Sequence, residues 1–262
     1  MPHTTRATIE SARSVRSSPG SGSIACFTLV ELLVVFALIS LLAGLLLPVL
    51  SRGKMTAQRI QCLGNLRQLS LATQMYWDDN SGNAFSYRLG STNGGDLYWF
   101  GWLARGIEGE RAFDRSQGIL FPYLGAFGVE VCPSLDYSFA QFKLKASGAS
   151  YGYGYNLCLS SVPSQPAVKI SRITRLSTTA LFADAAQVNT FQAPASPDHP
   201  MLEEFYYLST NEATTHFRHQ QKANVAFCDG HADLEKPATG SLDPRLPNQW
   251  IGRLRPEILV VP

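Results

Sequence analysis

The longest apolar run in the sequence covers residues 27–50, which read FTLVELLVVFALISLLAGLLLPVL. Only Thr28, Glu31 and Ser40 interrupt its apolar side chains. At 1.5 Å per residue, roughly 20 apolar residues form a helix that crosses the hydrocarbon core of a bilayer. The run therefore predicts a transmembrane helix. Glu31 is the anomaly, because a carboxylate inside such a segment costs about 3 kcal/mol and indicates a functional site.

After residue 50 the hydrophobic pattern changes to that of a helix with one apolar face. We expect residues 51–80 to continue the helix, with this face packed on a sheet, until the polar stretch DDNSGN at 78–83 ends it. The predicted face has a central stripe and a broader edge: Cys62, Leu66, Leu69, Thr73 and Tyr76 in the stripe, and Ile60, Leu63 and Met75 at the edge.

Residues 81–262 show short apolar and aromatic runs separated by Gly, Pro, Ser and Asn, a pattern typical of strands and loops. We therefore predict an α+β protein in which a long N-terminal helix packs on an antiparallel β-sheet head. Tyr151, Tyr153 and Tyr155 alternate with glycine, so their rings would line one sheet face, either for packing against the helix or for stacking on a sugar. The predicted strands are 98–103, 119–124, 129–132, 150–159, 179–183, 204–208, 223–228 and 258–261.

The sequence from Phe27 to Glu31, followed by the apolar run, resembles the class III signal of type IV pilins and type II secretion pseudopilins. The resemblance implies that a prepilin peptidase removes residues 1–26 as a leader, cutting between Cys26 and Phe27, and methylates the new amino terminus. It also implies that Glu31 pairs with the terminal amine of a neighbouring subunit during assembly. Where this chain has Cys26, the family has glycine.

The resemblance also implies a location. Residues 1–25 are rich in Ser, Arg and Gly and contain almost no large apolar side chain, as expected of a leader, although a start codon placed too early would leave the same pattern. Arginine and lysine flank both ends of the apolar run, so charge alone leaves the orientation open. The resemblance implies a single-pass protein of the bacterial inner membrane with residues 81–262 in the periplasm.

A second motif lies near the C-terminus, where His219 is followed after nine residues by Asp229 and Gly230. It resembles the His-x9-Asp-Gly motif of many pilin-like proteins. Residues 223–228 read as a buried strand and Asp229-Gly230 as a hairpin turn. Asp184, His219, Asp229 and His231 have side chains that suit a structural metal ion, but their spacing is not compact, and turn carboxylates with structural histidines are the alternative. We expect no other cofactor.

Five cysteines are present, and Cys26 would leave with the leader. The other four would enter an oxidising compartment, where three pairings are open to them. We prefer a disulfide between Cys132 and Cys158, with Cys62 and Cys228 as buried thiols.

Composition adds little to this picture. A net charge of +2 and the absence of a basic stripe give no reason to expect nucleic-acid binding. No nucleophile, base and orienting group occur at matching spacing, so we expect no enzymatic activity. Two functions stay open: a structural subunit that assembles with other pilin-like subunits through its N-terminal helix, and a membrane-tethered domain that binds a metal or a glycan.

Overall fold

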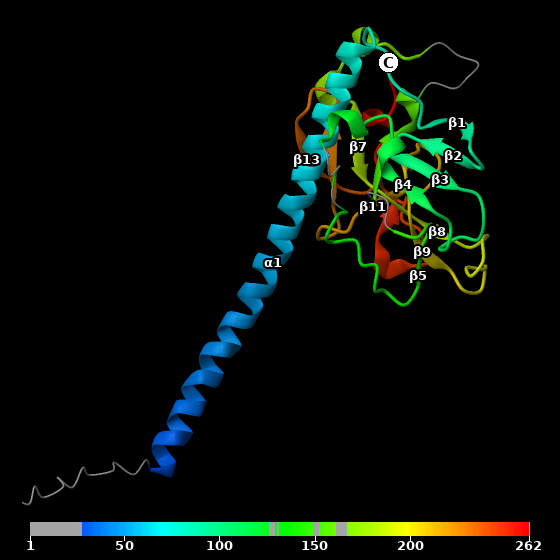
Figure 1. Ribbon diagram of the computed structural model, residues 1–262. Coiled ribbons are helices and arrows are strands. Elements are labelled where there is room, and N and C mark those ends of the chain that lie inside the picture. Colours follow the sequence, from blue (N-terminus) through cyan, green and yellow to red (C-terminus); the bar gives the residue numbers. More distant parts are fainter. Residues whose placement is uncertain (1–27, 126–128, 130, 149–151, 161–166, 262) are drawn as a thin grey trace, which may run out of the picture. The chain divides into compact units, whose positions relative to one another are not determined.

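The computed structural model describes residues 28–125, 129, 131–148, 152–160 and 167–261. The chain divides into two compact units, Met1–Val49 and Leu50–Pro262. One helix, α1 (Leu29–Asp79), belongs to both units, and strands follow it in the second (Figure 1). The predicted leader, with Cys26 and Phe27, lies outside the described residues.

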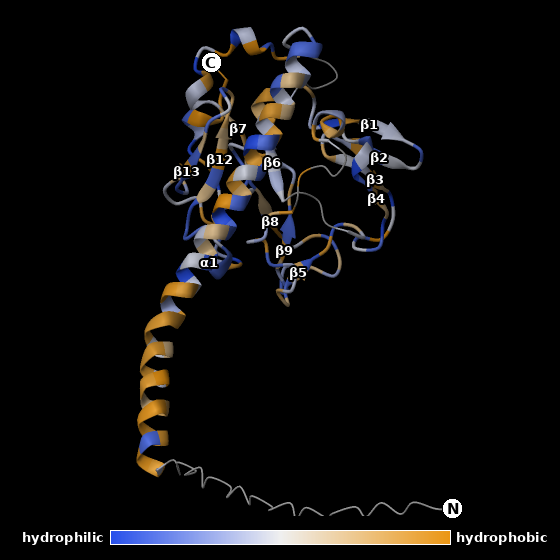
Figure 2. Cartoon of the chain, turned by 60° about the vertical axis from the view of Figure 1, so that its left-hand side comes forward, coloured by the Kyte–Doolittle hydropathy of each residue, from blue (hydrophilic) through white to orange (hydrophobic). Residues whose placement is uncertain are grey.

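The first unit consists of the N-terminal part of α1, and every described residue in it is exposed. Figure 2 shows this part as a nearly continuous band of hydrophobic residues. Among the described residues, α1 is the helix that is long and apolar enough to cross a membrane. The predicted apolar helix is therefore confirmed, and its length and composition suit a single membrane span.

The second part of α1 has the predicted buried face. Cys62, Leu66, Leu69 and Thr73 are buried, and Tyr76 is half-buried. The predicted broadening of this face is wrong at Ile60 and Met75, which are 58% and 45% exposed, because the buried face extends instead to Asn65, Ser70, Ala72 and Trp77. The helix ends as expected, one residue early at Asp79.

The buried face of α1 packs on a five-stranded sheet of order β10-β6-β7-β12-β13. The pairing of β10 with β6 is parallel and the other pairings are antiparallel. Ala226 of the interior strand β12 joins the core that contains Leu66, while Val225 packs on the opposite face with Leu254. The sheet is thus covered on both faces. Its strands are β6 (Tyr153–Asn156), β7 (Ala180–Asp184), β10 (Tyr207–Leu208), β12 (Ala223–Phe227) and β13 (Ala232–Glu235).

Three smaller sheets complete the described head, which corrects the prediction of one antiparallel sheet. They combine β1 (Arg88–Thr92), β2 (Gly95–Tyr98), β3 (Gly101–Ala104) and β4 (Phe113–Asp114); β5 (Phe142–Lys143), β9 (Met201–Glu204) and β8 (Ala186–Asn189); and β11 (Thr215–His216) with β14 (Ile251–Gly252). The pairing of β5 with β9 is also parallel. The α+β class is confirmed.

Two predicted strands are each divided: residues 98–103 span the turn between β2 and β3, and residues 204–208 join the end of β9 to β10. Three further predicted strands are wrong. The 3-10 helix η2 (Phe121–Tyr123) lies within residues 119–124, and the 3-10 helix η7 (Pro256–Ile258) ends at the first residue of 258–261. Each has proline in its first turn. Proline fixes φ near −65° and has no N–H for a ladder, so it favours these turns over strands. The described residues among 129–132 are also outside strands. The other 3-10 helices are η1 (Arg115–Gln117), η3 (Leu157–Leu159), η4 (Ile170–Arg172), η5 (Leu176–Thr178) and η6 (Pro247–Gln249).

The tyrosines of β6 serve packing. Tyr153 and Tyr155 are buried, and the hydroxyl of Tyr153 accepts a hydrogen bond of 2.9 Å from the amide of Asn65 on α1. The ring of Tyr155 stacks on Phe85 with a centroid distance of 4.3 Å. These two rings are therefore unavailable for stacking on a sugar, while Tyr151 lies outside the described residues.

Candidate functional site

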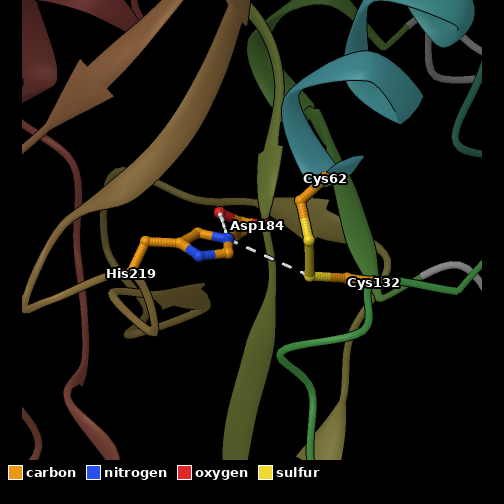
Figure 3. A group of neighbouring side chains, drawn as sticks. All are labelled: Cys62, Cys132, Asp184 and His219. Carbon is orange, nitrogen blue, oxygen red and sulfur yellow. Dashed lines mark hydrogen bonds and ion pairs between the residues drawn. A yellow bond between two sulfur atoms is a disulfide. The ribbon is translucent and has the colours of Figure 1, made fainter. Parts of the chain in front are cut away.

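A disulfide between Cys62 and Cys132 joins α1 to a loop of the head (Figure 3). Both residues are fully buried, and their Cα atoms are 5.2 Å apart. The predicted pairing of Cys132 with Cys158 is therefore wrong. Cys62 is on the helix stripe that faces the sheet, which brings its sulfur to Cys132, whereas Cys158 is a free, half-buried residue of η3. Cys228 is a free buried thiol, as predicted.

His219 and Asp184 lie directly beside this disulfide (Figure 3). His219 Nε2 is 3.2 Å from Asp184 Oδ2 and 3.9 Å from Cys132 Sγ. All four side chains are buried, and their candidate donor atoms lie within 4.8 Å of one another. Two sulfurs, an imidazole and a carboxylate thus converge from α1, a loop, the end of β7 and the segment before β12.

A tight turn holds His219 in place. The backbone amide of His219 donates to Lys222 O at 2.9 Å, and Lys222 N donates back to His219 O at 3.2 Å. Gln220 and Gln221 between them have φ values of 55° and 63°, which is the left-handed conformation that two-residue hairpin turns require. The turn directs the chain into β12 and leaves the imidazole against β7.

Asp184 is ionised in spite of its full burial. Burial acts to raise its pKa, but the Arg218 guanidinium at 3.0 Å and the hydrogen bonds from His219 and from Asn224 N outweigh it, so the pKa is below its ordinary value. Burial and the charge of Arg218 lower the pKa of His216 well below its usual range, so His216 is neutral near pH 7. The buried charge of Asp184 is thus balanced by Arg218.

The site borders the surface at one side. A hollow of about 470 Å³ is lined by Arg218 and His219, and by residues of α1 and the loop after Cys132 that include Gln58 and Pro133. The amide of Gln58 donates to Pro133 O at 3.2 Å across it. A small solute in this hollow therefore meets the imidazole of His219 before the sulfurs.

The four residues predicted as metal ligands form two pairs. Asp184 meets His219, whereas Asp229 meets His231 in the turn between β12 and β13, with 2.6 Å between Asp229 Oδ1 and His231 Nδ1. The group of candidate ligands among the described residues contains the first pair and neither member of the second. Cys62 and Cys132 were not among the ligands predicted from the sequence. The signal was there, because Cys62 is part of the helix stripe that was predicted to face the sheet.

The His-x9-Asp-Gly motif therefore marks the two ends of one strand. His219 precedes β12 at the disulfide, and Gly230 follows it with a φ of 92°. A Cβ atom at Gly230 would lie 2.8 Å from the amide nitrogen of Gln74, so the turn touches α1. Near the other end of the strand, Asn224 Nδ2 is 3.5 Å from Arg59 O. Fifteen helical residues span roughly 22 Å and six extended residues about 20 Å, so β12 follows α1 over this length.

Glu31 forms a capping box with Thr28 at the start of α1. Thr28 N and Thr28 Oγ1 each donate to Glu31 Oε2 at 2.8 Å, and Glu31 N donates to Thr28 Oγ1 at 3.2 Å. This reciprocal pair satisfies backbone N–H groups that a helix start leaves without partners. Glu31 thus has a local structural role, which does not depend on the assembly role that the pilin resemblance implies.

A second buried polar cluster is formed by residues of β5 and β9 and of the segment after β5. Glu203 Oε1 is 2.7 Å from Lys143 Nζ and 3.2 Å from Lys145 Nζ, while Glu203 Oε2 accepts from Asn189 at 3.0 Å. Glu108 also contacts Lys143. This cluster was not predicted, although Lys143 and Lys145 alternate with apolar residues in the sequence FKLKA at 142–146.

A cavity of about 530 Å³ adjoins this cluster. Its wall mixes aromatic rings with charged side chains, and Lys145 Nζ lies 5.2 Å from the ring centroid of Tyr206. Phe191 at the cavity is 71% exposed. The wall thus presents both aromatic rings and charged groups to a solute in the cavity. Its wall includes Tyr98, Glu108, Arg111, Lys145, Tyr206 and Glu212.

A comparison of the chain with models of known protein families finds no match, and neither do comparisons with curated proteins and with solved structures.

Proposed function

We propose that this chain is a non-enzymatic structural subunit of a type IV pilus-like or type II secretion pseudopilus-like assembly. In this proposal, a prepilin peptidase cuts before Phe27, α1 spans the bacterial inner membrane once, and the head is periplasmic. The observation that carries the proposal is the exposed apolar surface of α1 over residues 29–50, with Glu31 in its first turn. Such a surface needs lipid or the helices of other subunits around it.

The structure of Glu31 supports a second partner for its carboxylate. Both hydrogen bonds from Thr28 end on Oε2, which leaves Oε1 to accept from the terminal amine of a neighbouring subunit in the proposed assembly. An ion pair of this kind offsets the cost of a carboxylate in lipid. The Cys62–Cys132 disulfide supports the periplasmic placement, since disulfides persist in oxidising compartments.

Two matched substitutions separate the capping role of Glu31 from its assembly role. Glu31→Gln keeps an acceptor for Thr28 but removes the charge, whereas Thr28→Ala removes the hydroxyl of the capping box and keeps the charge. With the full chain expressed beside prepilin peptidase and its partner subunits, we expect both variants to stay in the membrane after carbonate extraction. We expect Glu31→Gln to be lost from sheared or cross-linked assemblies and Thr28→Ala to be retained.

A second candidate function is a membrane-tethered domain that binds a polar ligand such as a glycan, which the aromatic and charged cavity of about 530 Å³ favours. Anchoring in the membrane alone does not require a charged side chain at position 31. Incorporation of Glu31→Gln at the wild-type level would therefore reject the assembly proposal and leave the tethered domain as the better account.

A further inference from the structure

We propose that the buried group beside α1 has two states: the disulfide, and, after reduction, a tetrahedral zinc site formed by Cys62, Cys132, His219 and Asp184. The inference concerns the head and does not rest on the proposed function. Two thiolates, an imidazole and a carboxylate are ligands that Zn²⁺ accepts together, and hard ions such as Mg²⁺ or Ca²⁺ prefer oxygen alone. The disulfide state hides this ligand set, because the sulfurs bind each other.

The distances around His219 already suit this coordination. Zinc–sulfur bonds near 2.3 Å and zinc–nitrogen or zinc–oxygen bonds near 2.1 Å place neighbouring ligand atoms of a tetrahedron about 3.4–3.8 Å apart. His219 Nε2 lies 3.9 Å from Cys132 Sγ and 3.2 Å from Asp184 Oδ2. The two sulfurs must separate, and rotation of their side chains provides this once the bond between them is broken. The four donor atoms already lie within 4.8 Å of one another, so the other pairs must approach by about 1 Å at most.

Charge balance also favours the reduced site. In the disulfide state, Asp184 and Arg218 cancel each other's charge. In the zinc state, the ion adds two positive charges and the thiolates add two negative ones, so Arg218 still compensates Asp184. Both states are therefore neutral as a group, which a buried site requires if it is to avoid a large desolvation cost. Arg218 Nη2 and Asn224 N would orient the carboxylate from the second layer.

The conversion balances chemically. A dithiol reductant gives two electrons and two protons to the Cys62–Cys132 bond and itself becomes a disulfide. Zinc then displaces the two thiol protons, and His219 offers the lone pair of Nε2 with its ring proton on Nδ1. The hollow of about 470 Å³ that His219 lines provides a path for the ion to the imidazole.

The test uses the full chain in detergent, with Cys26, Cys158 and Cys228 replaced by serine so that Cys62 and Cys132 supply the only thiols. The protein is reduced with dithiol, desalted under argon and titrated with Co²⁺, a spectroscopic substitute for Zn²⁺. We expect one Co²⁺ per chain, with thiolate-to-cobalt charge-transfer absorption and the intense visible bands of tetrahedral cobalt. The oxidised protein should show neither band, and an excess of Zn²⁺ should bleach both.

Two histidine variants locate the site. His219→Ala should weaken Co²⁺ binding by more than about tenfold and change the visible bands, whereas His231→Ala, which alters the other Asp–His pair, should leave both unchanged. The proposal is overturned if the reduced chain binds no Co²⁺, including the case in which reduction unfolds it. Equal binding by the His219→Ala and parent proteins would also overturn it, since an unfolded dithiol would give that result.

Discussion

At the scale of single residues, the contacts that organise the head join positions far apart in the sequence. Asp184 receives hydrogen bonds or ion pairs from Arg218, His219 and Asn224, so the end of β7 fixes both the turn before β12 and the first part of that strand. At the opposite end of β12, Gly230 fits against Gln74 of α1. Within the His-x9-Asp-Gly motif, His219 contacts Asp184 and lies beside the Cys62–Cys132 disulfide, and Gly230 lies against α1. These contacts are structural reasons for His and Gly at the two positions.

Gly230→Ala is expected to destabilise the head by about 1–3 kcal/mol, from backbone strain at positive φ and from the contact of the new Cβ with Gln74. Gly240→Ala is the matched control, because Gly240 has a φ of 68° but no atom within 4 Å of its Cβ position. Denaturant unfolding followed by tryptophan fluorescence measures both. Adding Gln74→Ala should restore part of the loss at Gly230, and equal losses at the two glycines would show that the contact is irrelevant.

Glu203 should give the head an acid-sensitive stability. Burial acts to raise its pKa, but Lys145, Lys143 and a hydrogen bond from Asn189 outweigh this and lower the pKa to about 2. The unfolded chain then binds a proton near its ordinary pKa of 4.5 while the folded chain does not. The stabilisation is complete above about pH 4.5 and is lost as the pH falls toward about 2.

Comparison of Glu203→Gln with the parent protein measures this contribution. At pH 7 the variant leaves the buried ammonium group of Lys145 without its carboxylate and that of Lys143 with Glu108 alone, so we expect it to be less stable by about 3–5 kcal/mol. Between pH 4.5 and 2 the difference from the parent should narrow, and Glu257→Gln, at an exposed position, should show no such trend. A difference that stays constant across this range would contradict the proposed charge of Glu203.

At the scale of elements, the sequence predicted the long helix and its buried stripe, because apolar residues three and four positions apart lie on one face of a helix. The buried strands near 223–228 and 179–183 were likewise visible as continuous apolar runs. The short sheets were not, since strands of two residues such as β5 and β11 leave no period to detect. The Cys62–Cys132 pairing was also missed, because it depends on which loop crosses the helix stripe.

The Cys62–Cys132 disulfide links α1 to a loop of the head, so Cys62→Ser should lower the stability of the head. The disulfide closes a loop with a sequence separation of 70 residues, for which the chain-entropy model gives about 4 kcal/mol of stabilisation. Cys158→Ser removes a free, half-buried thiol and is the control. We expect a large drop in the denaturant midpoint for the first variant and a small one for the second. A midpoint for Cys62→Ser that matches that of Cys158→Ser would show that the bond adds no stability.

At the scale of the whole molecule, the two units differ in how much of their apolar surface is buried. The described residues up to Leu50 bury no side chain, while the core of the second unit includes Cys62, Leu66 and Leu69 from the later part of α1. The folding of the head therefore requires the second part of the helix and not the first. The first part contributes an exposed apolar surface, which favours a lipid environment over water.

Removal of residues 1–50 tests this division. The chain 51–262 should be soluble without detergent, show cooperative unfolding and keep the Cys62–Cys132 bond, because every buried residue of the two described hydrophobic cores lies after residue 50. The full chain should remain with the membrane fraction under carbonate extraction, because exposure of its apolar helix to water is unfavourable. Both chains are produced in one expression host, and the amount of each in the soluble and membrane fractions is compared. An insoluble or unfolded 51–262 fragment would mean that the apolar segment supports the head as well as anchoring it.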